Sequence, residues 1–296
     1  MPRIEYVPKR FSANSQEIID KANAILDEYR GQGFVLTLRQ LYYQFVSRGL
    51  LSNTEKSYSK LGRIINDARL AGMIDWNDLT DRTRNIQSLE QFDGPQDALN
   101  KLAGWYHIDM WKNQNHRPEV WIEKDALIGV IEQVCQELDV PYLSCRGYVS
   151  QSEMWTAGRR MKVWSEVTGQ APYVIHLGDH DPSGVDMSRD IEKRLTMFAE
   201  TPVKFTRIAL NMDQINHYKP PPNPAKITDS RAASYMSKYG DESWELDALN
   251  PQDMIELIRS AILEVTDHDV WKVDTRTELS VISKLQDVAR NWKDSL

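Results

Sequence analysis

The 296-residue chain predicts an α/β protein with a helical domain in front of a parallel sheet. From residue 117 onward, apolar strand-like segments alternate with amphipathic helical segments, which is the pattern of a parallel sheet with crossover helices. Before residue 117 the apolar residues recur mainly at helical spacing. Hydrophobic residues make up 41% and charged residues 27% of the chain, as in ordinary globular proteins.

Three helices and a short strand are predicted in the first domain, residues 1–86. Residues 13–30 carry an apolar stripe, and Gly31 follows it as a stop signal. Thr37 can cap a second helix over 38–46. A third helix is predicted over 56–71 and a strand over 73–76, an order that is typical of a winged-helix domain.

The third helix carries basic side chains, and in a winged helix it would be the recognition helix. Such a helix can enter the major groove of double-stranded DNA while its cations meet phosphates. A solvated charged surface is the alternative interpretation. The four candidate DNA-binding residues are Lys56, Lys60, Arg63 and Arg69.

Residues 87–116 are interpreted as a helical connector, and residues 117–270 as the sheet domain. Its strands are predicted near 118–123, 140–145, 172–178 and 203–210. Its helices are predicted near 125–138, 150–167 and 183–199. A C-terminal helix near 276–293 occupies the last region, 271–296, and is expected to pack or dimerise.

The run from Asp179 to Gly184, Asp-His-Asp-Pro-Ser-Gly, follows a buried strand. Asp179 and Asp181 are two residues apart, so an extended chain points both carboxylates to one side. Pro182 suits the first turn of a helix. Paired carboxylates at the mouth of a strand are suited to a hard divalent cation such as magnesium, although an isolated Asp-x-Asp is more often a solvated turn.

Glu123 ends an earlier predicted strand in the same way. If the two strands are neighbours in a parallel sheet, Glu123 converges with Asp179 and Asp181 at the carboxyl edge, where open α/β sheets build their sites.

These segments resemble the Toprim domain, and more closely the A subunit of topoisomerase VI and its relative, the meiotic double-strand-break transesterase. The strand-ending Glu123-Lys124-Asp125-Ala126 resembles that family's Glu-Lys-Asp-Ala. The run from Asp179 to Gly184 matches its Asp-x-Asp-Pro-x-Gly, and Glu245-Leu246-Asp247-Ala248-Leu249 resembles its Glu-x-x-Ala-Leu. A Gly-x-Pro-Asp segment of the family is loosely echoed at residues 146–150. The resemblance covers roughly residues 117–260 and implies a Rossmann-like Toprim fold.

The resemblance implies magnesium-dependent DNA cleavage through a tyrosine–5′-phosphate link, as in type IIB topoisomerases. It places magnesium on Glu123, Asp179 and Asp181, with Glu123 also as a general acid–base. Glu245, the extra acid Asp247 and Lys124 would support this site. The family's Arg-Asp-Ile-Tyr-Tyr segment corresponds to the run from Arg39 to Tyr43, so Tyr43 would be the nucleophile and Arg39, one helical turn before it, its cationic partner.

The sequence leaves the role of Tyr43 open, because Gln40 replaces the family's Asp and the segment also reads as plain core. If Tyr43 is structural, the same metal site could activate water, and the protein would be a hydrolytic Toprim nuclease of phage, plasmid or defence type. A non-catalytic DNA-binding module is the third alternative.

The chain has a formal net charge of −7, with +2 on residues 1–90 and −9 on the remainder, so DNA binding must depend on a local basic surface.

No apolar run approaches a membrane span, and no secretory signal core is present, so we expect a cytoplasmic, prokaryotic or phage-encoded protein. The family implies a homodimer. Because the chain lacks a P-loop motif, strand passage would require a separate ATPase subunit.

Overall fold

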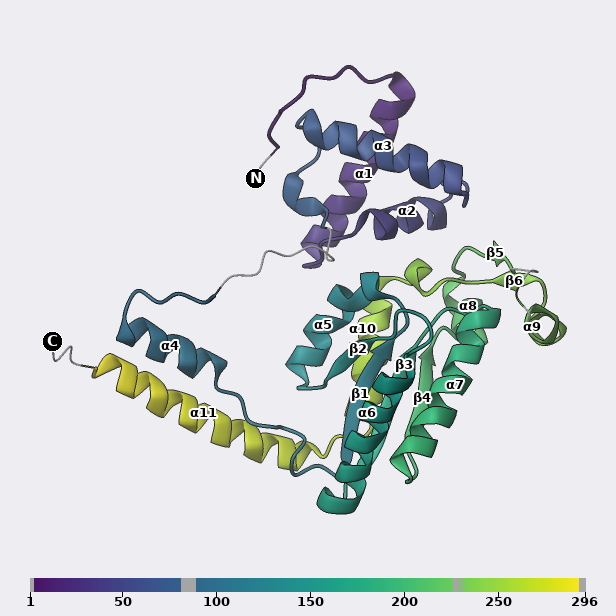
Figure 1. Ribbon diagram of the computed structural model, residues 1–296. Coiled ribbons are helices and arrows are strands. Elements are labelled where there is room, and N and C mark those ends of the chain that lie inside the picture. Colours follow the sequence, from purple (N-terminus) through teal and green to yellow (C-terminus); the bar gives the residue numbers. More distant parts are fainter. Residues whose placement is uncertain (1–2, 81–88, 226–228, 230, 293–296) are drawn as a thin grey trace.

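A four-stranded, fully parallel sheet forms the centre of the larger part of the molecule (Figure 1). In this computed structural model residues 3–80, 89–225, 229 and 231–292 are described. The strands lie in the spatial order β2 (Tyr142–Ser144), β1 (His116–Ile122), β3 (Ala171–Leu177) and β4 (Lys204–Ala209). The predicted mixed α/β class with a parallel sheet is therefore confirmed.

Helices cover both faces of the sheet (Figure 1). Alternate side chains of β1 point to opposite faces: Val120 and Ile122 pack in one hydrophobic cluster and Trp121 in another. The first cluster includes α5 (Ile128–Glu137) and α10 (Pro251–Leu263), and the second includes α6 (Gln151–Val163) and α7 (Pro182–Ala199). This part of the molecule is a three-layer α/β/α unit.

Short elements connect these layers. The segment predicted as one helix over 150–167 divides into α6 and the π-helix η3 (Trp164–Thr168), and the predicted helix over 125–138 begins with the 3₁₀ turn η2 (Asp125–Leu127). Beyond β4 lie α8 (Met212–Tyr218), α9 (Ala232–Tyr239), the 3₁₀ turn η4 (Leu246–Ala248) and an antiparallel pair, β5 (Asn223–Pro224) with β6 (Glu242–Ser243).

The N-terminal part contains the three predicted helices, α1 (Ala13–Gly31), α2 (Leu38–Ser47) and α3 (Glu55–Leu70). Thr37 and Gln40 form a capping box at the start of α2. The helices enclose their own hydrophobic cluster, in which Ile19, Leu41 and Ile65 are buried.

The predicted strand over 73–76 is wrong. Ile74 is buried in the helical cluster, and the side chain of Asp75 accepts a hydrogen bond from the Asn77 backbone, which starts the 3₁₀ turn η1 (Trp76–Asp78) instead. Within the described part of this region, strand pairing is limited to the isolated bridges Glu5–Ala71 and Leu36–Leu79. The winged-helix assignment stays a prediction, and its boundary at residues 86–87 lies outside the described residues.

The N-terminal helices contact the α/β unit directly. Ala248 of η4 belongs to the helical hydrophobic cluster. Asn250 donates a hydrogen bond to the Tyr29 hydroxyl at 3.2 Å, and Asn53 donates one to Asn223. The two parts therefore share a packed interface that includes the turn η4.

An arm of two antiparallel helices, α4 (Pro95–Trp105) and α11 (His268–Arg290), extends away from the sheet (Figure 1). The predicted C-terminal helix starts earlier than residue 276, because Asp267 caps it by accepting hydrogen bonds from the backbone of Asp269 and Val270. In the described ranges, no helix is both long and apolar enough to cross a bilayer.

The close approach of α6 to α7 depends on Gly158. A Cβ at this position would clash with Phe198 Cβ and would lie 2.9 Å from the Ala199 nitrogen. We predict that Gly158→Ala lowers the free energy of unfolding by about 1–3 kcal/mol, because α7 must shift. The matched control is Gly104→Ala in α4, where a Cβ meets nothing within 4 Å, and it should be neutral or stabilising by about 0.5 kcal/mol.

Urea denaturation of both variants measures these changes. Equal stability of the Gly158 and Gly104 variants would show that α6 and α7 are not packed through the glycine.

Candidate functional site

The carboxyl ends of β1 and β3 bring Glu123 and Asp179 together. Ile122 and Leu177 are aligned in the parallel ladder, and Glu123 and Asp179 follow these ends closely. Glu123 Oε2 accepts a hydrogen bond of 2.8 Å from the Asp179 backbone nitrogen. Asp179 Oδ1 in turn accepts one of 2.7 Å from the Leu246 nitrogen, so the acid pair is tied to η4.

The turn from β3 into α7 is tightly packed, and it holds Asp181. Asp181 Oδ1 accepts a hydrogen bond of 2.6 Å from the Gly184 nitrogen and caps α7, with Pro182 in the first turn. A Cβ at Gly178 would lie 2.9 Å from Glu123 Oε2, and one at Gly184 would clash with the Asp179 carbonyl oxygen. Both glycines are therefore needed for the acids to lie this close.

Burial and mutual repulsion raise the pKa values of two of these acids. Burial raises the pKa of Glu123 to about 7, and the charges of Asp179 and Asp181 add to the shift. Burial likewise raises the pKa of Asp179 to about 6, although the Lys124 ammonium opposes it. Removal from water is therefore the main reason that these two carboxyl groups resist ionisation.

Lys124 supplies the cation closest to these acids. Its Nζ lies 3.0 Å from Asp179 Oδ1, 2.9 Å from Glu245 Oε2 and 3.5 Å from Asp247 Oδ2. Despite its burial, these three carboxylates raise the pKa of Lys124, so the residue is a fixed positive charge. Burial opposes ionisation of Glu245, but Lys124, Tyr43 and Arg39 hold its pKa at about 2.

Arg39 joins this cluster from α2. Its Nη2 lies 2.9 Å from Glu245 Oε2, and its Nε lies 2.9 Å from Asp247 Oδ2. The Asp247 side chain is only 2% exposed, and neither of its oxygens accepts a hydrogen bond from the described residues. Asp247 is a buried anion held by the charges of Arg39 and Lys124.

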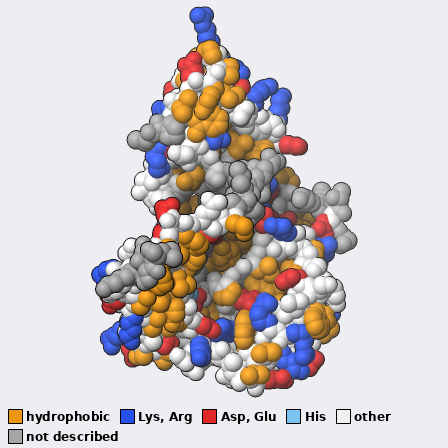
Figure 2. Space-filling view, turned by 60° about the vertical axis from the view of Figure 1, so that its left-hand side comes forward, with side chains coloured by type: hydrophobic (Ala, Val, Ile, Leu, Met, Phe, Trp, Pro, Cys, Tyr) orange, Lys and Arg blue, Asp and Glu red, His pale blue; other side chains and the backbone are white. Residues whose placement is uncertain are grey.

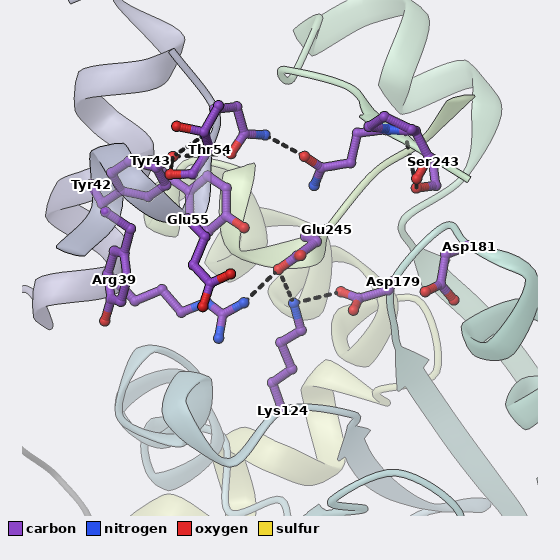
Figure 3. A pocket seen from close by; sticks show the side chains of 14 residues that line it. Arg39, Tyr42, Tyr43, Thr54, Glu55, Lys124, Asp179, Asp181, Ser243 and Glu245 are labelled. Carbon is purple, nitrogen blue, oxygen red and sulfur yellow. Dashed lines mark hydrogen bonds and ion pairs between the residues drawn. The ribbon is translucent and has the colours of Figure 1, made fainter. Parts of the chain in front are cut away.

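A cleft of about 590 Å³ lies between the N-terminal helices and the sheet edge, and it contains most of the predicted site (Figure 3). Arg39 and Tyr43 line it from α2, and Lys124, Asp179 and Asp181 line it from the other side. Tyr43 is only 4% exposed. Its burial and the Glu245 carboxylate raise its pKa well above the ordinary value for tyrosine.

The predicted DNA-binding residues divide into two groups. Lys56, Lys60 and Arg63 are exposed on α3 at spacings of four and three residues, which place them on one face. Arg69 does not belong with them, because its guanidinium donates to the Trp76 carbonyl at 2.8 Å and lies over the Trp76 ring. In this conformation Arg69 supports the η1 turn, and its assignment to DNA stays a prediction.

Three residues at the site were not predicted. Arg207 on β4 donates to the carbonyls of Gly178 and Asp179 behind the acids. Asn53 and Asn223 are hydrogen-bonded to each other at 2.5 Å and line the cleft. Arg207 is one arginine within β4, Asn53 stands in a loop and Asn223 in the two-residue strand β5, so no motif in the sequence marks them.

The donor chemistry of the acids fits a magnesium ion. The carboxylates of Glu123 and Asp179 supply the hard oxygen ligands that magnesium prefers, and their raised pKa values mean that a bound cation would favour their ionised forms. The described residues do not form a ready cage, since no group of three or more His, Cys, Asp or Glu side chains among them is arranged to hold a metal. Magnesium commonly binds through one or two carboxylates plus substrate phosphates, so this arrangement is compatible with a site completed by substrate.

Comparisons with known proteins do not identify the chain. No protein-family model matches it, and a search of curated proteins finds no significant match.

We predict a specific pH dependence for the acid pair. In the unfolded chain Glu123 titrates near 4.5, and in the folded protein near 7, so between these values the folded state binds more protons and loses stability as pH rises. Glu123→Gln keeps the acceptor for the Asp179 nitrogen but cannot ionise. The unfolding free energy of the wild type minus that of Glu123→Gln should therefore fall from pH 5 to pH 8, by on the order of 1–3 kcal/mol.

Urea denaturation at each pH, in chelator, measures this difference. A difference that is constant or rises with pH would contradict the assigned shift.

Proposed function

We propose that this protein cleaves DNA at the cleft between α2 and the sheet edge, in a magnesium-dependent reaction. The observation that carries the proposal is that Tyr43 and the acids Asp179 and Asp181 line one cleft together with Arg39 and Lys124. A hydroxyl nucleophile, two cations and paired carboxylates are the groups that phosphodiester transesterification requires. This arrangement agrees with the resemblance to the A subunit of topoisomerase VI.

The two cations would bind the scissile phosphate. Arg39 and Lys124 share Glu245 as a partner, each at 2.9 Å, so a phosphate that displaces Glu245 would meet both. Arg39 is half exposed and can move with α2. The cations of α3 would hold neighbouring phosphates of the duplex and leave the cleft for the reacting one.

Magnesium would be held by Asp179 and Asp181, with Glu123 as the third acid. When bound, it would neutralise charge on the phosphate and on the leaving oxygen. Where Glu123 does not ligate the ion, its pKa of about 7 would let it hold a proton near neutral pH and donate it to the leaving 3′ oxygen.

Tyr43 would attack phosphorus through its hydroxyl oxygen. Once the phosphate has displaced Glu245 from Arg39 and Lys124, the cations that hold its pKa low, this carboxylate would accept the phenolic proton. The new bond would join the tyrosine oxygen to the 5′ phosphate, and the bond to the 3′ oxygen would break. Because Tyr43 is 4% exposed, a phosphate reaches it only after α2 moves away from η4. The contacts of Arg39 with Glu245 and Asp247 would have to open in that movement.

A hydrolytic nuclease is the second candidate, and the burial of Tyr43 favours it. A tyrosine that is 4% exposed and has a raised pKa is a poor nucleophile in this conformation. Asp181 is partly exposed and lines the cleft without any change in α2, so water could attack a phosphate beside it.

Double-strand cleavage would need two copies of the chain, one for each strand. The arm of α4 and α11 offers apolar side chains for such an association, because Leu102, Trp105, Val288 and Trp292 are all at least 46% exposed. Figure 2 shows hydrophobic side chains gathered on the surface of this arm. Strand passage after cleavage would require a separate ATPase subunit.

The metal prediction concerns the paired acids. Asp179→Asn and Asp181→Asn should each abolish magnesium-dependent nicking of supercoiled DNA, because an amide is a weak magnesium ligand. Asn still caps a helix, so α7 should remain intact in the second variant. Asp213→Asn, at an exposed acid in the first turn of α8, is the control and should cleave normally. Cleavage by wild-type protein in excess chelator would rule out the metal.

The tyrosine prediction separates the two candidates. Tyr43→Phe should block cleavage and remove the covalent protein–DNA adduct, which is detected by omitting protease digestion before the gel. Tyr42→Phe is the control: its hydroxyl bonds to the loop at Ser52 and Thr54, so its loss should cost about 1 kcal/mol of stability and leave cleavage intact. Cleavage by Tyr43→Phe at the wild-type rate, with no adduct, would establish hydrolysis.

The binding prediction concerns α3. Charge reversal in the double variant Lys56→Glu with Lys60→Glu should weaken DNA binding and reduce the slope of log affinity against log salt by about 2. The matched control reverses Lys193 and Lys284, which are exposed on α7 and α11. Fluorescence anisotropy at several salt concentrations measures both slopes. Equal slopes in the two double variants would place the DNA away from α3.

A further inference from the structure

Arg207 lies on the inner side of the turn that carries the paired acids, away from the cleft. Its Nη2 donates to the carbonyl oxygens of Gly178 at 2.9 Å, Asp179 at 2.5 Å and Leu210 at 3.3 Å. Its Nη1 donates to the Gly184 carbonyl at 3.1 Å and to Ser188 Oγ at 2.5 Å. One guanidinium thus connects the end of β3, the first turn of α7 and the residue after β4.

The local backbone directs Arg207 toward this turn. The register between β3 and β4 shifts after the pair His176–Arg207, because Leu177 is aligned with Ala209. An irregularity of this kind changes the direction of nearby side chains. Ser188 of α7 helps to hold Arg207 in this direction, since its hydroxyl lies 3.1 Å from His176 Nδ1 and also contacts Arg207.

The five acceptors of Arg207 are neutral oxygens, so its charge is not neutralised by a direct carboxylate contact. The acids that interact with it electrostatically are Glu123, Asp179 and Asp181. These acids therefore lie between a cation on the inner side, Arg207, and one on the cleft side, Lys124. A cation behind the turn stabilises ionised ligands while it leaves their cleft side open.

We propose that Arg207 is a positioning residue for metal binding: its planar guanidinium holds the β3–α7 turn so that Asp179 and Asp181 present their carboxylates to one ion. This inference rests on the magnesium site of the proposed function. The shape of the side chain matters as well as its charge, because a lysine ammonium cannot span the carbonyls of Gly178 and Gly184 together with Ser188.

The experiment measures metal binding rather than cleavage. Mn²⁺, as a paramagnetic substitute for Mg²⁺, is titrated into wild-type protein, Arg207→Lys and Arg194→Lys, and free ion is followed by electron paramagnetic resonance. Arg194 is the matched control, since it is also an inward-turned arginine that bonds a backbone carbonyl, that of Val149, but it is remote from the acids. We expect Arg207→Lys to bind Mn²⁺ about 10- to 100-fold more weakly and Arg194→Lys to bind as wild type.

Thermal unfolding of each variant and a further variant, Ser188→Ala, distinguish a folding defect from a specific loss of metal affinity. This variant removes one contact of Arg207 and no charge, and it should weaken Mn²⁺ binding less than Arg207→Lys but in the same direction. Wild-type affinity in Arg207→Lys, or equal losses in Arg207→Lys and Arg194→Lys, overturns the inference, as does a wild-type protein that binds no Mn²⁺.

The outcomes also separate this inference from the proposed function. Normal Mn²⁺ binding by Arg207→Lys, with normal DNA cleavage, would contradict the proposed role of Arg207 and support the proposed function. If Arg207→Lys loses Mn²⁺ affinity as expected, but the wild type binds Mn²⁺ and does not cleave DNA, the role of Arg207 is supported and the proposed function is contradicted.

Discussion

The ionic cluster at the carboxyl ends of β1 and β3 is the interaction on which the rest of the structure depends. Lys124 lies within 3.5 Å of three carboxylates: one from the turn after β3, one from the residue before η4 and one from within η4. Removing a cation from such a cluster would leave buried anions uncompensated, which costs several kcal/mol. The conformation of η4, and with it the packing of α2 on Ala248, is set by this requirement.

Charge compensation also links the two parts of the molecule. Arg39 from α2 completes the neutralisation of Glu245 and Asp247. The buried acids are therefore stable only while the N-terminal helices are docked on the sheet unit. The same contacts cover Tyr43. Entry of a phosphate would replace the carboxylate partner of Arg39 by another anion, so ligand binding and separation of the two parts would compete for the same cation.

Part of the fold and of the site was predictable from sequence. Apolar runs between polar turns located the four strands, most clearly β3, which is buried along nearly all of its length. The alignment of β1 with β3 then confirmed that Glu123 and Asp179 meet. The prediction of a strand at 73–76 was wrong because a short apolar run does not distinguish a strand from a buried turn. The hydrogen bond from the Asn77 backbone to the Asp75 side chain stabilises the turn.

By itself, the sequence determined the classes of element and the acids at the strand ends, because these depend on residues close together in the chain. Only the tertiary structure decided which cations meet those acids. Arg39 and Glu245 are 206 residues apart, and no periodicity relates them. The sequence did not single out Arg207 and grouped Arg69 with the basic residues of its helix, and the partners of both are mostly backbone carbonyls. A carbonyl acceptor belongs to every residue type, so only the folded backbone shows where a guanidinium will find one.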